Sequence, residues 1–288
     1  MSCSVLIPAY NASHTIEETI RSVLDQTIDA PIEVIVCDDR SSDDTVAKVQ
    51  AMAAVDKRIV LLCNTENMGV SRTRNRMLDH VQSQWIAFLD ADDIFLPEKL
   101  ERCVAELQKT QSQLLFHNLG YLLHSGEVKG KVEGIGFPPA AIFSKEAIGD
   151  MRFNTSLLVG EDTDFFRRVK LSAKWVHFPQ VLTGMRIQPG SLTDRNWLLK
   201  RVVEHWHSEH DGDGKTHAPT SAVEYMGYFR SMSPLRRFGL YRQWLGQKFG
   251  RLGAGHLFAG KKIHAVRYLI MAGLLNPGYL MDRLMTKR

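Results

Sequence analysis

Apolar and polar positions along the first hundred residues alternate between two patterns. Short apolar runs are each followed by a stretch in which apolar residues recur with the helical period. In the first such stretch, Ile16, Ile20, Val23 and Leu24 stand at i, i+4, i+7 and i+8, which is one helical face. The predicted strands are residues 3–8, 33–37, 58–63 and 85–89, and the further predicted helices are residues 43–54, residues 71–81 and a segment after Pro97. This alternation predicts an α/β fold with a mostly parallel sheet sandwiched by helices.

Individual residues refine some of these elements. Ser41 or Ser42 is available as the N-cap of the second helix, and Pro97 is well placed as the first residue of the fourth. Cys37 and Cys63 fall in runs that are predicted as buried strands. The four cysteines show no C-x-x-C spacing, so we expect all four to be reduced, with neither a zinc site nor a redox pair.

The pattern is looser after residue 110. The elements predicted there are strands at 114–117 and 120–124, a glycine-rich hairpin or loop at 126–136, and a helix at 195–207. The polar segment 205–214 is predicted as a loop that separates the body of the chain from its C-terminal part.

Charge is distributed unevenly along the chain. The 288 residues carry a formal net charge of +4, with 44% apolar and 24% charged residues, as in ordinary globular proteins. Eleven basic residues and a single acid, Asp282, lie between Ser233 and Arg288. The preceding part therefore holds 25 of the 36 basic and 31 of the 32 acidic residues, a net charge of about −6. An acidic body joined to a basic tail predicts a separate partner for the tail.

Apolar runs in the sequence are short. None approaches the roughly 18 residues that a membrane-spanning helix requires. The first apolar stretch opens at Val5 and is interrupted by Pro8 and Asn11, unlike the apolar core of a signal peptide. We therefore expect a cytoplasmic protein.

Polar residues directly follow three of the predicted strands. Tyr10-Asn11, Asp38-Asp39 and the segment 90–93 each come just after an apolar run. Because ligands of such sheets bind outside the carboxyl ends of the strands, we expect these clusters to meet on one rim.

The segment 90–93 contains three carboxylates, those of Asp90, Asp92 and Asp93. They repel one another unless a positive charge lies between them. A hard cation such as Mg²⁺ or Mn²⁺ prefers oxygen ligands and usually shares its shell with substrate phosphates. These residues therefore predict a divalent metal site. The alternative is an ordinary helix N-terminus, where the helix dipole also favours acids.

Two further segments carry candidate chemistry. Glu161-Asp162 can supply a general base, or only the first-turn acids of a capped helix. Near Gly69, backbone N–H groups together with Arg74 can bind a diphosphate, although a glycine before a helix and solvated arginines are common. The absence of G-x-G-x-x-G and G-x-x-x-x-G-K-[ST] argues against a dinucleotide dehydrogenase or a P-loop enzyme.

Taken in order, these segments resemble the family 2 glycosyltransferases, which share the GT-A fold. The motifs that carry the resemblance are residues 5–11, 36–45, 67–69 with 74–75, 88–93 and 160–162. The resemblance covers roughly residues 3–195 and is strongest before residue 100. We accordingly predict a catalytic domain at residues 1–205, with a nucleotide-binding half at about 1–110 and an acceptor half at about 111–205. Residues 206–288 then form a basic, mainly helical C-terminal extension.

The resemblance implies a role for each residue at a matching position. Those implied to bind the nucleotide sugar are Pro8, Ala9 and Tyr10 at the base, Asp39 hydrogen-bonded to the base, Gly69 and Arg74 along the nucleotide pocket, Asp90 near the ribose, and Arg186 at the diphosphate. Those implied to hold the divalent metal, Mn²⁺ or Mg²⁺, are Asp92 first, with Asp90 and Asp93. Asp162 is implied as the catalytic base and Glu161 as its supporting neighbour.

One position departs from the family. Relatives often carry a His in a segment similar to residues 186–193, where this chain has Gln188. If that His holds metal or diphosphate in relatives, the role is absent here or has passed to another group. His205, His207 and His210 are candidates, against the alternative of a solvated polar loop.

The resemblance implies an inverting glycosyltransferase that moves a sugar from a nucleotide diphosphate sugar to a hydroxyl of a saccharide or lipid-linked acceptor. Cell-surface polysaccharide, lipopolysaccharide or glycolipid assembly is the implied setting. A catalytically silent protein of the same fold is one alternative, against which the intact Asp92 and Asp162 argue. A sugar nucleotidyltransferase is another, but the chain lacks a glycine-rich loop with Arg and Lys after the first strand.

The basic tail contains a helical pattern of its own. Phe238, Tyr241, Leu245 and Phe249 are spaced for one helical face. Such a segment can lie on an anionic membrane surface, where each basic residue near the lipid adds about 1 kcal/mol, or it can pack on the catalytic domain. Lipid-linked acceptors favour the membrane, with the protein peripheral on its inner face. Nucleic acid is not an expected partner, because the acidic body would repel it.

Overall fold

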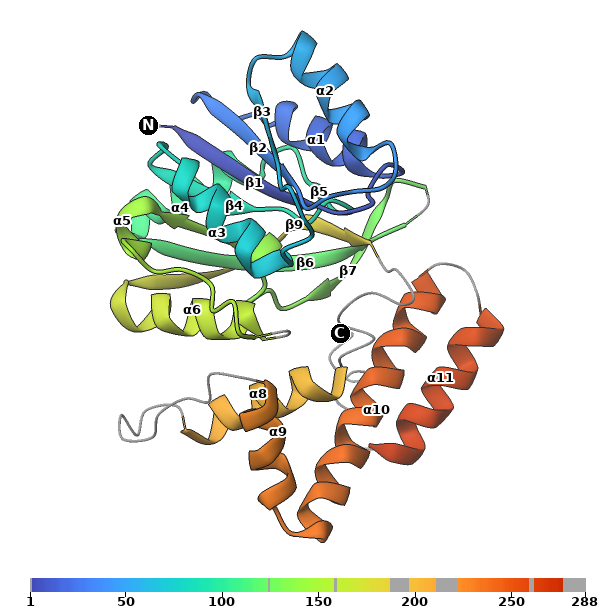
Figure 1. The fold of residues 1–288 in the computed structure, drawn as a ribbon. Helices are drawn as coiled ribbons and strands as arrows, with labels where there is room; N and C mark the ends of the chain where they lie inside the picture. The colour runs from blue at the N-terminus through green and yellow to red at the C-terminus, as the bar shows by residue number, and fades with distance from the viewer. Residues whose placement is uncertain are drawn as a thin grey trace. The chain divides into compact units, whose positions relative to one another are not determined.

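The computed structural model describes residues 2–123, 125–157, 160–186, 197–210, 222–258 and 262–276. The chain divides into two compact units, one of residues 1–122 and 130–186, the other of residues 123–129 and 187–288. Figure 1 shows the first unit as a sheet with helices and the second as a group of helices. The first unit ends at Arg186, so the predicted boundary near residue 205 falls inside helix α8 (Trp197–His210) of the second.

A mixed β-sheet forms the centre of the first unit (Figure 1). Its strands are β1 (Cys3–Ala9), β2 (Ile32–Asp38), β3 (Ile59–Cys63), β4 (Trp85–Phe88), β5 (Ile94–Phe95), β6 (Leu114–Leu122), β7 (Val128–Val132), β8 (Ala141–Ser144) and β9 (Trp175–Arg186). They lie in the order β3-β2-β1-β4-β8-β6-β9-β5, with β7 paired to β6. The run β3-β2-β1-β4 is parallel, as predicted. Beyond it the sheet is mixed, because β8 is antiparallel to β4 and β6, and β5 is antiparallel to β9.

Helices cover both faces of this sheet, which confirms the predicted fold class. Helices α1 (Ile16–Leu24), α2 (Thr45–Val55) and α4 (Lys99–Thr110) pack on one face, in a core that includes Val5 and Ile7 of β1. Helices α3 (Val70–His80), α5 (Lys145–Ile148) and α6 (Glu161–Ser172) pack on the other face, in a core that includes Leu6. Neighbouring residues of β1 therefore enter opposite cores, as the two-residue period of a strand requires.

Two helix starts differ from the prediction. Helix α2 begins at Thr45, whose N–H donates to Asp43 Oδ1 at 3.0 Å, and neither predicted serine caps it. The hydroxyl of Ser41 instead accepts the N–H of Asn11. Helix α4 begins at Lys99, so Pro97 lies before the helix rather than at its first position.

Later elements also differ in extent. Residues 114–122 form the single strand β6, whose register against β9 shifts on both sides of Asn118, where the sequence pattern predicted a break. Cys63 is exposed because it ends the edge strand β3, whereas Cys37 is buried as predicted, and all four cysteines are free. The residues from His205 to His210 are helical rather than a loop, and 211–214 lie outside the described residues.

The described residues of the second unit after residue 187 are mainly helical. Besides α8 it contains α9 (Ala222–Ser231), α10 (Pro234–Phe258) and α11 (Lys262–Leu275). Helices α10 and α11 approach closely, since a Cβ atom added at Gly246 would lie 2.4 Å from the Cβ of Asn276. Glu209 of α8 accepts hydrogen bonds from Tyr228 of α9 and Arg236 of α10, which joins three helices. Within the described ranges, no helix has both the length and the apolar character needed to cross a bilayer.

A cluster of aromatic rings holds α6 against the sheet. Phe143 of β8 is fully buried, and its ring centroid lies 5.8 Å from that of Phe88, 6.2 Å from that of Phe165 and 6.0 Å from that of Phe166.

We predict that Phe143→Ala lowers the free energy of unfolding by about 3–5 kcal/mol, because the lost contacts leave a cavity. Leu171→Ala, at a position that is 76% exposed, should change it by less than about 0.5 kcal/mol. Urea unfolding followed by circular dichroism measures both, and similar values for the two variants would contradict the packing described.

Candidate functional site

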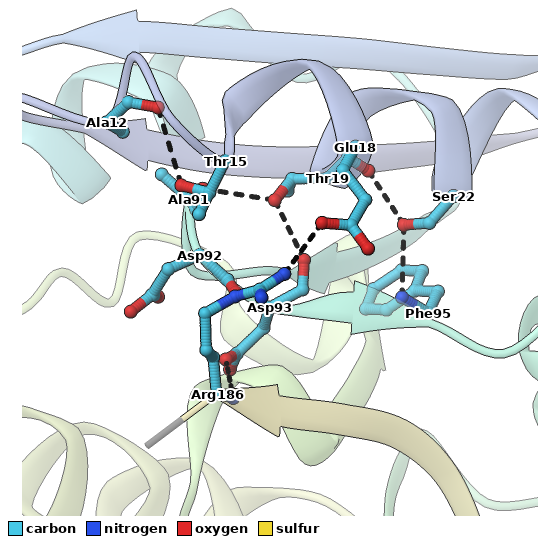
Figure 2. A network of polar contacts seen from close by, with 10 residues as sticks. All are labelled: Ala12, Thr15, Glu18, Thr19, Ser22, Ala91, Asp92, Asp93, Phe95 and Arg186. Atoms are coloured by element: carbon cyan, nitrogen blue, oxygen red, sulfur yellow. Dashed lines mark hydrogen bonds and ion pairs between the residues drawn. The ribbon is translucent and has the colours of Figure 1, made fainter. Parts of the chain in front are cut away.

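The acidic segment 90–93 forms the loop between β4 and β5. Asp93 is 3% exposed, and its Oδ1 accepts the backbone N–H of Arg186 at 2.9 Å. Its own N–H donates to the carbonyl of Asp90, which closes a tight turn. Figure 2 shows the Asp92 carboxylate pointing away from this network. Asp93 thus anchors the loop to β9, and Asp90 and Asp92 are the carboxylates that remain to face a ligand.

Helix α1 holds the same loop from the other side. The hydroxyl of Thr15 donates to the carbonyl of Ala91 at 2.8 Å, and that of Thr19 contacts the carbonyls of Ala91 and Asp93 at 3.0 and 2.8 Å (Figure 2). Neither threonine was predicted as a site residue. The available signal was Thr19, a polar residue placed between the apolar positions of α1.

Arg186 was expected at a diphosphate, but the structure gives its guanidinium other partners. Its Nε donates to the carbonyl of Asp92 at 2.9 Å, and its Nη2 pairs with Glu18 of α1 at 2.7 Å (Figure 2). Arg186 is therefore a clamp that joins β9, the acidic loop and α1. Gln188, the predicted departure from the family pattern, lies outside the described residues.

Burial and mutual repulsion raise the pKa values of two carboxyls in this loop, those of Asp92 and Asp93. Burial, and then the charge of Asp90, raises the pKa of Asp92 to about 6. Burial and the charges of Asp90 and Asp92 raise the pKa of Asp93 well above its ordinary value. A divalent cation would relieve this repulsion, because it favours the ionised carboxylates.

The donor set fits a cation that is shared with a substrate. Among the described residues, no three His, Cys, Asp or Glu side chains converge as a metal site. Asp90 and Asp92 offer two carboxylates, and Mg²⁺ commonly binds to one or two carboxylates while substrate phosphates and water complete its shell. The loop therefore suits a metal that arrives with a phosphorylated ligand.

A buried lysine lies behind the loop and was missed by the sequence analysis. Lys99 is fully buried, its Nζ donates to the carbonyl of Pro139 at 2.7 Å, and it stands 3.3 Å from the ring centroid of Phe95. Burial lowers its pKa well below the usual range, and the charge of Asp93 opposes this shift.

Arg74 of α3 connects the two acidic motifs. Its Nη1 pairs with Glu161 Oε1 at 2.9 Å and its Nη2 with Asp90 Oδ1 at 3.4 Å. The guanidinium carbon lies 5.8 Å from the ring centroid of Phe88 and 5.3 Å from that of Phe153. Arg74 is only 5% exposed, so the residue predicted to line a pocket is a buried bridge between the acidic loop and α6.

The predicted base motif begins α6. Gly160, at φ 80°, precedes the helix, and Glu161 and Asp162 are each 9% exposed in its first turn. Asp162 Oδ1 accepts the N–H of Thr163 at 2.7 Å. The side chain of Asn75 on α3 accepts the N–H of Phe153 at 2.7 Å and donates to its carbonyl at 2.9 Å, which joins α3 to the segment before this motif.

The loop before α3 is organised by Asp39. Its Oδ1 accepts the Asn64 side chain at 2.7 Å and the N–H of Met68 at 2.8 Å, and its Oδ2 accepts the N–H of Gly69 at 2.8 Å. These N–H groups, expected to bind a diphosphate, are thus occupied by a carboxylate of the protein. Gly69 adopts φ 84° and ψ 161°, which favours glycine, although a Cβ there would meet nothing within 4 Å. Asn64, directly after β3, was missed.

The end of β1 provides the exposed part of the rim. Tyr10 is 55% exposed and Pro8 is partly exposed, whereas Ala9 is buried and its carbonyl accepts the N–H of Asp39 at 2.8 Å. Asp38 Oδ2 accepts the N–H of Ser41, but its buried Oδ1 has no hydrogen-bond partner among the described residues.

The candidate histidines lie on α8 in the second unit. His205 is 3.5 Å from Glu209, one turn further along the helix. The ring of His210 stacks on that of Trp206 with centroids 4.4 Å apart, and its Nδ1 contacts the Trp206 carbonyl. Both form contacts within the helical unit. The side chain of His207 lies outside the described residues.

Solved structures of other proteins share the fold of this chain. The Staphylococcus aureus protein TarS, solved as residues 1–349 with UDP-GlcNAc, shares the fold with a TM-score of 0.59 and 17% identity, over 98% of this chain and 92% of that one. A mannosyltransferase of Pyrobaculum calidifontis, solved with GDP-Man and Mn²⁺, gives a TM-score of 0.56 and 17% identity, over 96% and 87% of the two chains. The fold is that of the GT-A glycosyltransferases.

The sequence identifies the family within that class. Residues 4–148 match the profile of glycosyl transferase family 2, and the chain belongs to this family. The Escherichia coli glucosyltransferase WfgD, which acts on UDP-Glc and α-D-GlcNAc-diphosphoundecaprenol, is 40% identical over 128 residues, 44% of this chain and 49% of that protein. The chain spans about half the length of the curated relatives it matches.

The Arg74 bridge can be tested by unfolding experiments. We predict that Arg74→Met lowers the free energy of unfolding by about 3 kcal/mol, because it removes the cationic partner of a buried carboxylate. Glu161→Gln keeps a similar shape without the charge, so the double variant should be less destabilised than the sum of the two single variants. Urea unfolding of all three variants gives this coupling, and strict additivity would argue against the bridge.

The raised pKa of Asp92 predicts a pH effect on the metal-free protein. Between pH 4 and 6 the folded state holds a proton that the unfolded carboxyl releases, so this group's contribution to stability falls as pH rises through about 6. Asp92→Asn should therefore be more stable than the natural chain at pH 7.5 in EDTA, by on the order of 1–2 kcal/mol, and close to it at pH 4.

The same comparison includes a control for the metal. Excess Mn²⁺ at pH 7.5 should shift stability in favour of the natural chain, because the cation binds the ionised carboxylate. Thermal unfolding at both pH values measures the difference. An Asp92→Asn variant less stable than the natural chain at pH 7.5 in EDTA would sink the prediction.

Proposed function

We propose that the chain is an inverting glycosyltransferase that moves a sugar from a nucleoside diphosphate sugar to an acceptor hydroxyl. The observation that carries this proposal is the Arg74 bridge, which brings the acidic loop and the start of α6 together at one rim of the sheet. In this proposal the donor binds at the acidic loop and the base lies at the start of α6. Membership of glycosyl transferase family 2 supports the same reaction.

In this proposal Asp92 and Asp90 would hold a divalent Mn²⁺ or Mg²⁺, whose charge offsets that of the leaving diphosphate. Asp162 takes the proton of the acceptor hydroxyl. The acceptor oxygen forms a bond to C1 from one face of the sugar while the bond from C1 to the diphosphate oxygen breaks on the other. The electron pair leaves with the nucleoside diphosphate, and the configuration at C1 is inverted.

Other residues have positioning roles in this mechanism. Glu161 pairs with Arg74 and so fixes the first turn of α6, where Asp162 lies. Asp93 and Arg186 hold the acidic loop against β9 and α1. At the nucleotide, the exposed Tyr10 offers a ring to the base.

The named relatives support a donor class and an acceptor class for this proposal. WfgD uses UDP-Glc, and TarS was solved with UDP-GlcNAc, which favour a UDP-sugar over the GDP-Man of the archaeal neighbour. The diphosphoundecaprenol acceptor of WfgD favours a lipid-linked acceptor. We therefore propose a cytoplasmic protein at the inner face of the membrane that acts in surface polysaccharide or glycolipid assembly.

The first experiment is a thermal unfolding series with UDP, GDP and their sugar derivatives, in Mn²⁺ or in EDTA. A nucleotide at 100 times its Kd should add about 2.7 kcal/mol of stability. We expect a UDP-sugar to stabilise only with metal, and Asp92→Asn to abolish the shift. The surface variant Asp29→Asn should behave as the natural chain, because Asp29 is exposed. If no nucleotide stabilises the protein in either condition, the donor site is wrong.

The role of Asp162 is tested separately. Asp162→Asn should retain the nucleotide shift but lose about 10²-fold or more in release of the nucleoside diphosphate from the stabilising sugar nucleotide, with water in place of the acceptor hydroxyl. Equal release by Asp162→Asn and the natural chain would contradict the role of Asp162 as the base.

A further inference from the structure

Helix α11 turns an apolar face to solvent. Val266, Ile270, Met271 and Leu274 are 54%, 58%, 43% and 71% exposed, and their spacing of four, five and eight residues places them on one side of the helix. Ala272 is fully buried in the same helix. A solvated helix normally has the opposite arrangement, with its apolar stripe against the core.

The start of α10 repeats this feature. Leu235, Phe238 and Tyr241 are 86%, 69% and 40% exposed, again at helical spacing, and Arg242 beside them is exposed. Together with the four residues of α11 they are called the exposed tail residues below. Seven large apolar side chains in solvent within so short a segment indicate a surface that is covered when the protein works.

We infer that the exposed tail residues bind the surface of an anionic lipid bilayer. The argument is one of charge complementarity, because the segment from Ser233 to Arg288 contains eleven basic residues and one acid. Helices with apolar residues on one side and basic residues nearby lie in the interface, where the apolar side chains enter the headgroup boundary and the cations meet anionic lipids. This inference rests on the proposed membrane association and specifies the residues that form it.

Two other occupants of this surface, the first unit of the same chain and a second copy of the chain, fit less well. In the described part of the first unit, the exposed large apolar residues are spread over separate elements: Tyr10 after β1, Val55 on α2, Leu171 on α6 and Trp175 on β9. These offer no matching apolar patch. A second copy of the chain would bring two strongly basic segments together, and like charges oppose such contact.

The test uses the full chain and sedimentation with large unilamellar vesicles. We expect at least about tenfold stronger binding to phosphatidylcholine with one quarter phosphatidylglycerol than to phosphatidylcholine alone, and weaker binding as salt is raised. Ile270→Glu with Leu274→Glu should reduce binding about tenfold or more, since it places charge where apolar side chains enter the lipid. The matched control, Val55→Glu with Leu171→Glu, changes two apolar residues of the first unit that are 88% and 76% exposed, and it should bind as the natural chain does.

The outcomes separate this inference from the proposed function. The nucleotide shift in Mn²⁺ is measured on every variant, and we expect it to be unchanged in the tail variant. If the natural chain binds vesicles but no nucleotide, the membrane inference is supported and the proposed donor site is contradicted. The inference is overturned if the natural chain ignores anionic vesicles, if the tail variant binds them equally well, or if the tail variant turns a dimer into a monomer. Should the double variant fail to fold, Leu274→Gln, at the most exposed of the four positions on α11, provides the same comparison.

Discussion

The buried guanidinium of Arg74 is the interaction on which the arrangement of the site depends. Taking a cation out of water is unfavourable unless anionic partners and polarisable surfaces surround it, and here Glu161, Asp90 and two aromatic rings do so. Arg74 lies on α3, Glu161 on α6, and Asp90 follows β4. One side chain therefore sets the relative positions of two helices and a strand end, and the chemistry proposed for the rim requires that all three remain in place.

The sequence predicted the first half of the fold closely, for a physical reason. Parallel strands covered on both faces are continuous apolar runs, and β1 to β4 were found within one or two residues of their observed ends. The second half was harder because β6 buries His117 and Asn118 in mid-strand, which breaks the apolar pattern. The antiparallel placement of β8 between β4 and β6 is set by tertiary pairing, for which the local sequence carries no signal.

The roles assigned to the site residues stay predictions, and the structure adds contacts within the protein that the sequence did not reveal. Asp39, Arg74 and Arg186 were placed at the rim as groups that touch a ligand, yet each is engaged by the protein itself. A sequence motif indicates which residue types lie at the rim of the sheet. Their hydrogen-bond and ion-pair partners come from distant parts of the chain, so the motif does not identify them. Thr19 and Glu18 on α1 contact the acidic loop and Arg186 across long sequence separations, so the local pattern of α1 does not identify these partners.

The contact between Asp93 and Arg186 joins residues 93 positions apart, and β5 beside it has β9 as its antiparallel neighbour. On the ribosome, β1 to β4 and their helices can assemble while the rest of the chain is still unmade. The acidic loop, by contrast, has neither its anchor nor its neighbouring strand until residue 186 has left the exit tunnel. A nascent chain interrupted before that point would have most of its parallel sheet but no fixed acidic loop, so this part of the rim forms at a late stage of synthesis.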